Sequence, residues 1–151
     1  MDRMSKRSLT ASPSIGARDV FGLYVHIPFC RTKCPYCDFN TYAGLERLIP
    51  GYLEALRRDL VLWGRILGRP FTTSVFIGGG TPSLLNAKQM DALMRSISES
   101  FDLKSGAEIT AEVNPDDVDK ARLIGFRNAG INRISVGIQA LDDPQLALLG
   151  R

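Results

Sequence analysis

The chain has 151 residues, of which 44% are hydrophobic and 23% are charged, a composition typical of globular proteins. Its 19 basic and 16 acidic residues leave a formal net charge of +3, too small a surplus to indicate a dedicated nucleic-acid binder. No apolar run reaches the roughly 18 residues that a membrane-spanning helix needs, so the sequence predicts no transmembrane segment.

Residues 1–19 are rich in serine and basic residues and contain no apolar core of the signal-peptide type. Their scarcity of acidic residues leaves a mitochondrial transit peptide open, but the lack of a clear amphipathic stripe favours a disordered tail. We therefore expect a disordered tail over 1–19 and an ordered part over 20–151. We also expect a cytoplasmic protein, or a mitochondrial one if the source is eukaryotic.

The first ordered elements follow a strand–helix–strand pattern. The run FGLYVHI at 21–27 predicts a strand. Apolar residues then recur at steps of three and four as far as Leu67, which predicts a helix whose regular part begins at Pro50. The short, β-branched run at 73–77 predicts a second strand, which leads into three consecutive glycines.

A second helix is predicted after the glycines. Asn86 has the character of an N-cap, and Gln89 stands three residues later, which is the capping-box spacing. A stripe that includes Met90 and Met94 at helical spacing is interpreted as the face packed on the core.

Two further strands are predicted at 107–113 and 133–138. A third helix lies between them and is closed by Gly130 in the C′ position, and Pro144 stands at the start of another helix. Four strands alternating with helices predict an α/β fold with a parallel sheet built from right-handed βα units.

Chemically distinctive residues recur just after these strands. The cysteines follow the first strand, the glycines follow the second, Glu112 lies near the end of the third and Gln139 follows the fourth. In parallel α/β folds, ligands bind at the carboxyl ends of the strands. The sequence therefore predicts one site at this rim of the sheet.

The three cysteines, Cys30, Cys34 and Cys37, are spaced C-x3-C-x2-C. An odd number of clustered thiols argues against a secreted disulfide framework and favours a metal or cluster in a reducing compartment. Three thiolates can bind three irons of a 4Fe–4S cluster and leave the fourth iron open, which a catalytic centre requires. We predict these three residues to be the cluster ligands.

A zinc site made of the three cysteines and His26, the only histidine, is the alternative. The cysteine spacing fits poorly with the paired C-x2-C knuckles of structural zinc. His26 is more simply interpreted as a hydrogen-bonded strand residue. A zinc-stabilised binding module remains the alternative from another functional class.

The cysteine motif, with an aromatic residue before its last cysteine, resembles the radical S-adenosylmethionine (SAM) signature. The strings YVHIPFC at 24–30 and CPYCDFN at 34–40 resemble the oxygen-independent coproporphyrinogen oxidase-like family. GGGTPS at 78–83, EVNP at 112–115 and SVGIQ at 135–139 match further blocks of that family in the same order.

The resemblance implies a TIM-like (βα) barrel of the radical SAM type, of which this chain supplies about four of about six units. We expect residues 20–151 to be the N-terminal part of that barrel in a truncated product or fragmentary gene model, with an exposed strand edge. The resemblance also implies that SAM binds the open iron. One electron, from a reductant such as flavodoxin or ferredoxin, would then cleave SAM to methionine and a 5′-deoxyadenosyl radical. The residues that match the family's SAM-contacting positions are Tyr24, Tyr36, Gly79, Gly80, Thr81, Glu112, Gln139 and Arg151.

The family contains coproporphyrinogen dehydrogenases, which decarboxylate a porphyrinogen, and a heme-chaperone branch. In the dehydrogenases a further cysteine stands two positions after the third ligand, where this chain has Phe39. The dehydrogenases also have a longer N-terminal extension. The resemblance thus favours a chaperone that binds heme or porphyrin and delivers heme to an acceptor protein. Coproporphyrinogen dehydrogenase activity stays open as the alternative, and no catalytic residue is assigned beyond the cluster ligands.

Overall fold

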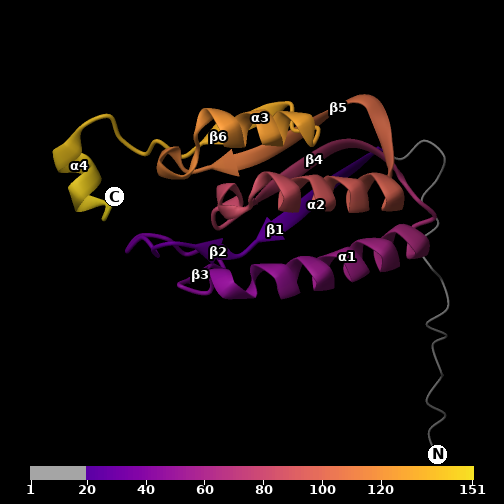
Figure 1. The fold of residues 1–151 in the computed structure, drawn as a ribbon, viewed down its shortest axis with the longest axis horizontal. Coiled ribbons are helices and arrows are strands. Elements are labelled where there is room, and N and C mark those ends of the chain that lie inside the picture. The colour runs from indigo at the N-terminus through magenta and orange to yellow at the C-terminus, as the bar shows by residue number, and fades with distance from the viewer. Residues whose placement is uncertain (1–19) are drawn as a thin grey trace, which may run out of the picture.

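The computed structural model describes residues 20–151 (Figure 1). The expectations for 1–19, a disordered tail or a transit peptide, lie outside the described residues. In chain order, the strands are β1 Phe21–Ile27, β2 Phe29–Cys30, β3 Tyr42–Ala43, β4 Phe71–Gly79, β5 Asp102–Val113 and β6 Arg133–Val136. The helices are α1 Ile49–Ile66, α2 Ala87–Ser100, α3 Lys120–Asn128 and α4 Asp143–Leu148, and the 3₁₀ turns are η1 Glu46–Leu48, η2 Pro82–Leu84 and η3 Pro115–Asp117.

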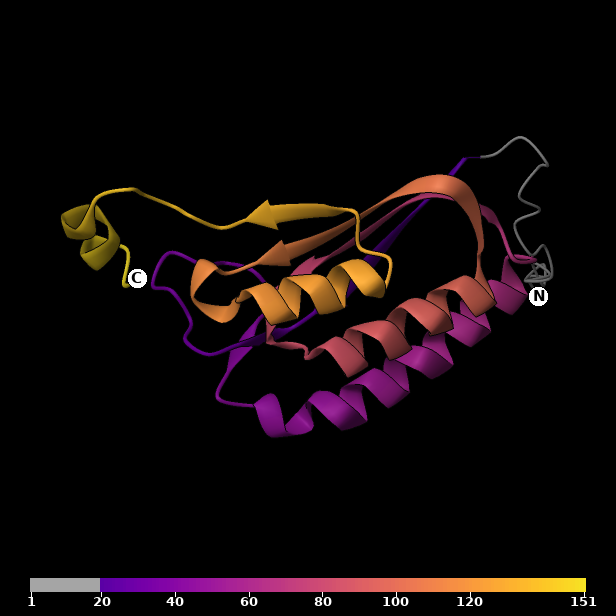
Figure 2. The same ribbon diagram turned by 45° about the horizontal axis from the view of Figure 1, so that its top comes forward.

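Four strands form one parallel sheet in the order β1-β4-β5-β6. Figure 2 shows α1, α2 and α3 on the same side of this sheet, and α4 beyond the ends of the strands. The order of the strands follows the chain, as it does in a barrel wall made of successive βα units. The prediction of an α/β fold with a parallel sheet of the partial-barrel type is confirmed.

The core lies between the sheet and the three helices. Val25 and Ile27 of β1 and Ile77 of β4 are almost completely buried, as alternation along a strand packed on helices requires. Met90 and Met94 of α2 are also buried, which confirms that the methionine stripe packs on the core.

The strand boundaries differ from the predicted ones in a way that matters for the site. β4 runs from Phe71 to Gly79 rather than over 73–77, because its parallel pairing with β1 continues through Gly78 and Gly79. These glycines were expected in a loop and are the last residues of a strand. β5 begins earlier than predicted, and β6 ends at Val136 rather than at residue 138.

The helix signals were accurate to within one residue. α1 begins at Ile49, one residue before Pro50. The Asn86 side chain accepts a hydrogen bond from the Gln89 backbone N–H, and the Gln89 side chain accepts one from the Asn86 N–H, both at 2.9 Å. Gly130 follows α3 with a φ of 106°, the left-handed conformation expected of a C′ glycine.

A two-stranded parallel sheet, β2 with β3, was not predicted. Phe29 pairs with Tyr42 and Cys30 with Ala43, and the Tyr42 N–H donates to the Pro28 carbonyl at 2.7 Å. The two strands hold the ends of the segment 31–41, called the cysteine loop below. Within residues 20–151, no helix combines the length and the hydropathy needed to cross a membrane.

Candidate functional site

A cavity of about 420 Å³ opens where the cysteine loop meets the carboxyl ends of β4, β5 and β6. The structure brings most of the predicted site residues to its wall even though they come from four separate segments of the chain. Those that line it are Cys30, Cys34, Tyr36, Cys37, Gly79, Gly80, Thr81, Glu112, Gln139 and Arg151.

All three cysteines are partly buried and carry free thiols. The Thr81 hydroxyl donates to Cys30 Sγ at 3.5 Å, and Arg151 Nη1 lies 3.7 Å from Cys34 Sγ. Two of the sulfur atoms thus have partners from separate segments, the glycine run after β4 and the residue that follows α4. Since sulfur forms weak hydrogen bonds, these contacts orient the thiols without closing the site.

The glycine run passes directly behind the first cysteine. The Gly80 N–H donates to the Ile27 carbonyl at 2.8 Å and the Thr81 N–H to the Phe29 carbonyl at 2.7 Å. A Cβ atom on Gly80 would lie 2.6 Å from the Phe29 carbonyl oxygen and 3.0 Å from Cys30 Sγ. Only glycine allows this approach, so the run lets the backbone, rather than side chains, form this part of the wall.

Glu112 reaches across from β5 to the end of β4. Its Oε2 atom accepts a hydrogen bond from the Gly79 N–H at 3.1 Å. A Cβ atom on Gly78 would lie 2.7 Å from the same oxygen. The carboxylate therefore packs against the glycine run at the cavity wall and does not point away from the site.

Tyr24 is the one predicted site residue that does not line the cavity in this structure. Its ring stacks on Phe76 with 6.2 Å between the ring centroids, and its hydroxyl donates to His26 Nδ1 at 2.9 Å. Burial of the ring, and then the nearby carboxylate of Glu112, raise the pKa of Tyr24. Tyr24 contacts the site through His26, which stands between it and the cysteine loop.

His26 is a hydrogen-bonded strand residue, as interpreted from the sequence. Its Nε2 lies 2.9 Å from the Asn40 carbonyl oxygen and therefore donates, since a carbonyl can only accept. Nδ1 is then the acceptor for the Tyr24 hydroxyl. Both ring nitrogens are used, which leaves His26 without a free lone pair for a metal.

The arrangement of the thiols bears on which metal group fits them. Among residues 20–151, no three histidine, cysteine, aspartate or glutamate side chains gather so as to hold one metal ion. A tetrahedral zinc site needs its ligands to converge on one point, whereas each cysteine of a 4Fe–4S cluster binds a different iron. Three free thiols line one open cavity with a glycine wall behind Cys30, which is a donor set that such a cluster can use.

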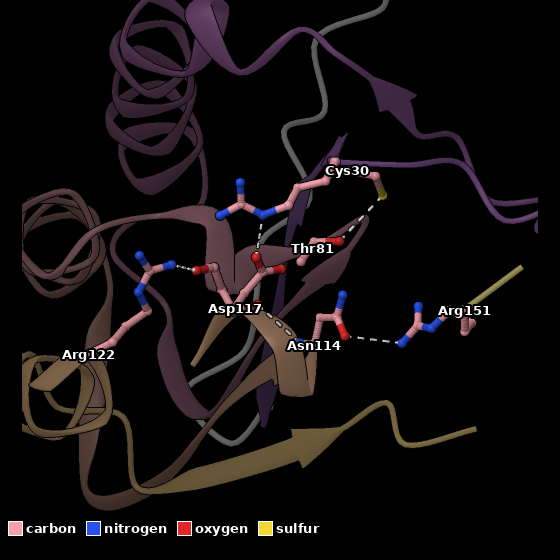
Figure 3. A network of polar contacts seen from close by, with 8 residues as sticks. Cys30, Thr81, Asn114, Asp117, Arg122 and Arg151 are labelled. Atoms are coloured by element: carbon pink, nitrogen blue, oxygen red, sulfur yellow. Dashed lines mark hydrogen bonds and ion pairs between the residues drawn. The ribbon is translucent and has the colours of Figure 1, made fainter. Parts of the chain in front are cut away.

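Gln139 and Arg151 complete the side of the cavity that follows β6. Gln139 has a φ of 67°, which turns the chain sharply after Gly137. Arg151 Nη2 donates to the Gly137 carbonyl at 2.9 Å. It also donates to Asn114 Oδ1 at 3.2 Å, as Figure 3 shows. The guanidinium group is thereby held in place between β5, the segment after β6 and the thiol of Cys34.

Sequence reasoning missed three polar residues at the site. Asn114 and Asp117 lie in the turn between β5 and α3, and Asp117 contacts Arg31 of the cysteine loop. Asn114 belongs to a motif that was recognised, but its role as an acceptor for Arg151 was not assigned. The signal that could have drawn attention to Asp117 is a pair of acidic residues after Pro115 at the ligand-binding end of a strand.

Comparison with known proteins shows which family the chain resembles. Residues 24–151 match the Radical SAM superfamily. The chain is 42% identical over 134 residues to the heme chaperone HemW of Haemophilus influenzae and 44% identical over 134 residues to that of Escherichia coli. It is 41% identical over 146 residues to the mitochondrial radical S-adenosyl methionine domain-containing protein 1 of Bos taurus. These alignments cover 85%, 85% and 93% of this chain, but only 35%, 34% and 31% of the relatives.

A solved structure gives the same result. The radical SAM enzyme coproporphyrinogen III oxidase (HemN) from Escherichia coli superposes with a TM-score of 0.84 at 33% identity, over 93% of this chain and 32% of that one. The chain thus spans about a third of the length of the proteins it matches. The motifs at the cavity, the parallel sheet and these matches agree: the chain belongs to the radical SAM superfamily.

Proposed function

We propose that the protein holds a 4Fe–4S cluster on Cys30, Cys34 and Cys37, binds SAM at the open iron, and acts as a heme chaperone. The observation that carries the proposal is that three free thiols and the glycine run line one cavity at the carboxyl ends of the strands. Similarity to two HemW heme chaperones, at 42% and 44% identity, supports the chaperone role.

The cluster, once bound, supplies the electron for the reductive cleavage of SAM. The residues of the chain hold and surround it. Gly80 lets the backbone approach Cys30, and Thr81 donates a hydrogen bond to the sulfur. The guanidinium of Arg151 beside Cys34 partly offsets the negative charge that three thiolates bring together.

SAM would occupy the part of the cavity between the thiols and the strand ends. The glycine run, with the Glu112 carboxylate packed against it, would line one part of this space. Gln139 and Arg151 would line the part that follows β6, with Tyr36 on the cysteine loop. Backbone groups and one carboxylate suit the amino-acid part of SAM, which carries both an ammonium and a carboxylate group. Tyr24 would contribute through His26 rather than by direct contact.

Coproporphyrinogen dehydrogenase activity is the second candidate, because the structural neighbour is a coproporphyrinogen III oxidase. Phe39 argues for the chaperone instead. It is 64% exposed, lines the cavity, and stands where the dehydrogenases of the family have a further cysteine. Heme would then be the cargo, with an acceptor protein as its destination and a flavodoxin or ferredoxin as the reductant. We propose a cytoplasmic location, although several relatives, the Bos taurus protein among them, are mitochondrial by name.

The cluster is tested by anaerobic reconstitution with iron and sulfide, followed by EPR of the dithionite-reduced protein with and without SAM. We expect a reduced 4Fe–4S signal that changes when SAM is added. Cys30→Ala should abolish it, and Ser98→Ala, an exposed change on α2, should not. A colourless protein that binds one zinc and no iron would instead establish the zinc-stabilised module.

The two heme-related activities are separated by their products. Heme is titrated into the reconstituted protein and followed by its Soret absorption. In a parallel experiment, coproporphyrinogen III is added with SAM and reductant. Heme binding without decarboxylated product is expected of a chaperone. Release of methionine and 5′-deoxyadenosine in proportion to decarboxylated product would establish the dehydrogenase.

A further inference from the structure

The cysteine loop, residues 31–41, contains no helix or strand. Two backbone hydrogen bonds, from Cys37 N–H to the Cys34 carbonyl and from Thr41 N–H to the Phe39 carbonyl, form turns within it, and its place on the sheet depends on contacts made by its side chains and ends. Its returning end is held where His26 Nε2 donates to the Asn40 carbonyl. Its outgoing end carries Arg31, directly after Cys30. Whatever holds Arg31 therefore restricts where the Cys30 thiol lies.

Arg31 is held by Asp117, a residue 86 positions later in the chain. Arg31 Nε lies 2.5 Å from Asp117 Oδ1, and the two side chains are 63% and 1% exposed. The second oxygen of Asp117, Oδ2, is buried without a hydrogen-bond partner within residues 20–151. A buried carboxylate is costly to leave unpaired, so its charge strongly favours conformations in which Arg31 stays in contact with it.

The turn that carries Asp117 is itself firmly held (Figure 3). The Asp117 N–H donates to the Asn114 carbonyl at 3.0 Å and closes the 3₁₀ turn η3. The Asn114 N–H donates to Ser83 Oγ at 3.0 Å, and Arg122 donates to the Ser83 carbonyl. These bonds join the turns that follow β4 and β5, so Asp117 projects from a fixed base.

The same turn also reaches the second thiol. Asn114 Oδ1 accepts a hydrogen bond from Arg151 Nη2 at 3.2 Å, and Arg151 Nη1 lies 3.7 Å from Cys34 Sγ. Two of the three cysteines are thus linked to one turn, Cys30 through its neighbour Arg31 and Cys34 through Arg151.

We infer that Asp117 is a positioning residue. It fixes the outgoing end of the cysteine loop through Arg31 and so sets the position of Cys30 before any cluster is assembled. Asp117 does not line the cavity and acts only through Arg31. The restraint of the cysteine loop by Asp117 follows from the contacts described above. The further statement that this restraint helps to hold a cluster rests on the proposed function.

The first test uses the metal-free chain. The rates at which iodoacetamide alkylates each cysteine are measured by mass spectrometry for the unaltered chain, Asp117→Asn, Arg31→Gln and the double variant. We expect either single change to raise the Cys30 rate about tenfold, the effect of losing one charge-assisted hydrogen bond. The double variant should match the singles, because the second change removes a partner whose contact is already lost.

Asp102→Asn is the control for the loss of one carboxylate, since Asp102 is exposed at the start of β5 and does not line the cavity. It should leave the Cys30 rate unchanged. Arg31→Gln leaves the buried Asp117 carboxylate without its partner, whereas Asp117→Asn removes the buried charge at nearly constant size, so Asp117→Asn keeps the test decisive if Arg31→Gln does not fold. Arg31→Lys, which keeps the positive charge, should alkylate more slowly than Arg31→Gln. Unchanged Cys30 rates in Arg31→Gln, or additive effects in the double variant, would overturn the inference.

The second test measures properties of the reconstituted cluster. After anaerobic reconstitution, the reduction potential and the EPR line shape are recorded for Arg31→Gln and for Asp102→Asn. We expect the EPR line shape or the reduction potential to change in Arg31→Gln and to stay the same in the control. A Cys30 that is no longer fixed in position would bind its iron with a different geometry. If the unaltered chain assembles no cluster, the proposed function fails, while the alkylation rates still decide whether Asp117 positions the loop.

Discussion

Gly80 shows most directly how a single residue shapes this site. The backbone there passes between the Ile27 and Phe29 carbonyls, and the Cys30 sulfur lies where a side chain would begin. Neither carbonyl can move without disturbing β1 or β2. The residue is therefore constrained by packing even though its own φ does not require glycine.

Replacing Gly80 with alanine should both destabilise the fold and prevent cluster assembly. The added methyl group would overlap backbone atoms, and overpacking of this kind costs about 1–3 kcal/mol. Urea unfolding of the metal-free chain measures the first effect, and iron content after reconstitution measures the second.

Gly51→Ala is the control for Gly80→Ala, because a Cβ atom on Gly51 in α1 would meet nothing within 4 Å. It should leave cluster assembly intact and stabilise the helix by about 0.4–1 kcal/mol. If Gly80→Ala matched it in both measurements, the close approach of the two segments would not constrain the protein.

At the residue scale, the sequence predicted what depends on spacing and motif. Cys30, Cys34 and Cys37 could be recognised as candidate ligands of one metal site, because three thiols within eight residues are informative by themselves. The pairing of Arg31 with Asp117 could not, because the two residues are 86 positions apart and either could equally have been a solvated surface charge. A single sequence carries no signal for such a contact.

Among the elements, α2 offers the clearest link between local sequence and stability. Its start is fixed by the reciprocal bonds between Asn86 and Gln89, which satisfy two backbone N–H groups that the helix would otherwise leave free. Asn86→Ala should lower the free energy of unfolding by about 1 kcal/mol.

Chemical denaturation of Asn86→Ala and of Lys88→Ala would check this value. Lys88 is an exposed residue in the same first turn and takes no part in the capping box, so its substitution should be close to neutral. Equal losses in both variants would mean that the capping box does not stabilise the helix.

The boundaries of the strands could not be predicted from the sequence pattern alone. Periodicity found all four strands of the main sheet, but pairing between neighbours lengthened β4 and β5 beyond their β-branched runs. β2 and β3 are two residues each and were missed, because so short a strand has no periodicity and exists only through its partner.

Across the whole molecule, both edges of the main sheet are open in the described chain, where β1 pairs only with β4 and β6 only with β5. Apolar side chains are exposed near the β6 edge, including Val136, Ile138 and, at 93% exposure, Leu141. Open edges with apolar neighbours template association with other chains.

The 151-residue chain prepared alone is therefore expected to self-associate as its concentration rises. Sedimentation velocity would measure this, and Val136→Lys should reduce it by placing a charge on the edge. Leu62→Lys, the same kind of change on the exposed part of α1, should have little effect. A chain that stayed monomeric over a hundredfold range of concentration would contradict this expectation.

At this scale the fold class was within reach of the sequence, because alternating strands and helices admit few architectures. The residues that line the cavity could be predicted only in part. The rule that ligands bind at the carboxyl ends of parallel strands identified the segments that line the cavity. It could not show that the Tyr24 side chain would contact His26 rather than line the cavity.

The pairing of β2 with β3 has a further consequence, which concerns entropy. By joining Phe29 to Tyr42 and Cys30 to Ala43, it makes residues 31–41 a ring that is already closed when the chain folds. The entropic cost of bringing the ends together is met during folding, not when iron arrives. If the protein holds the proposed cluster, the three thiols would meet an incoming iron atom at a high effective concentration, so binding of the first iron would favour binding of the next.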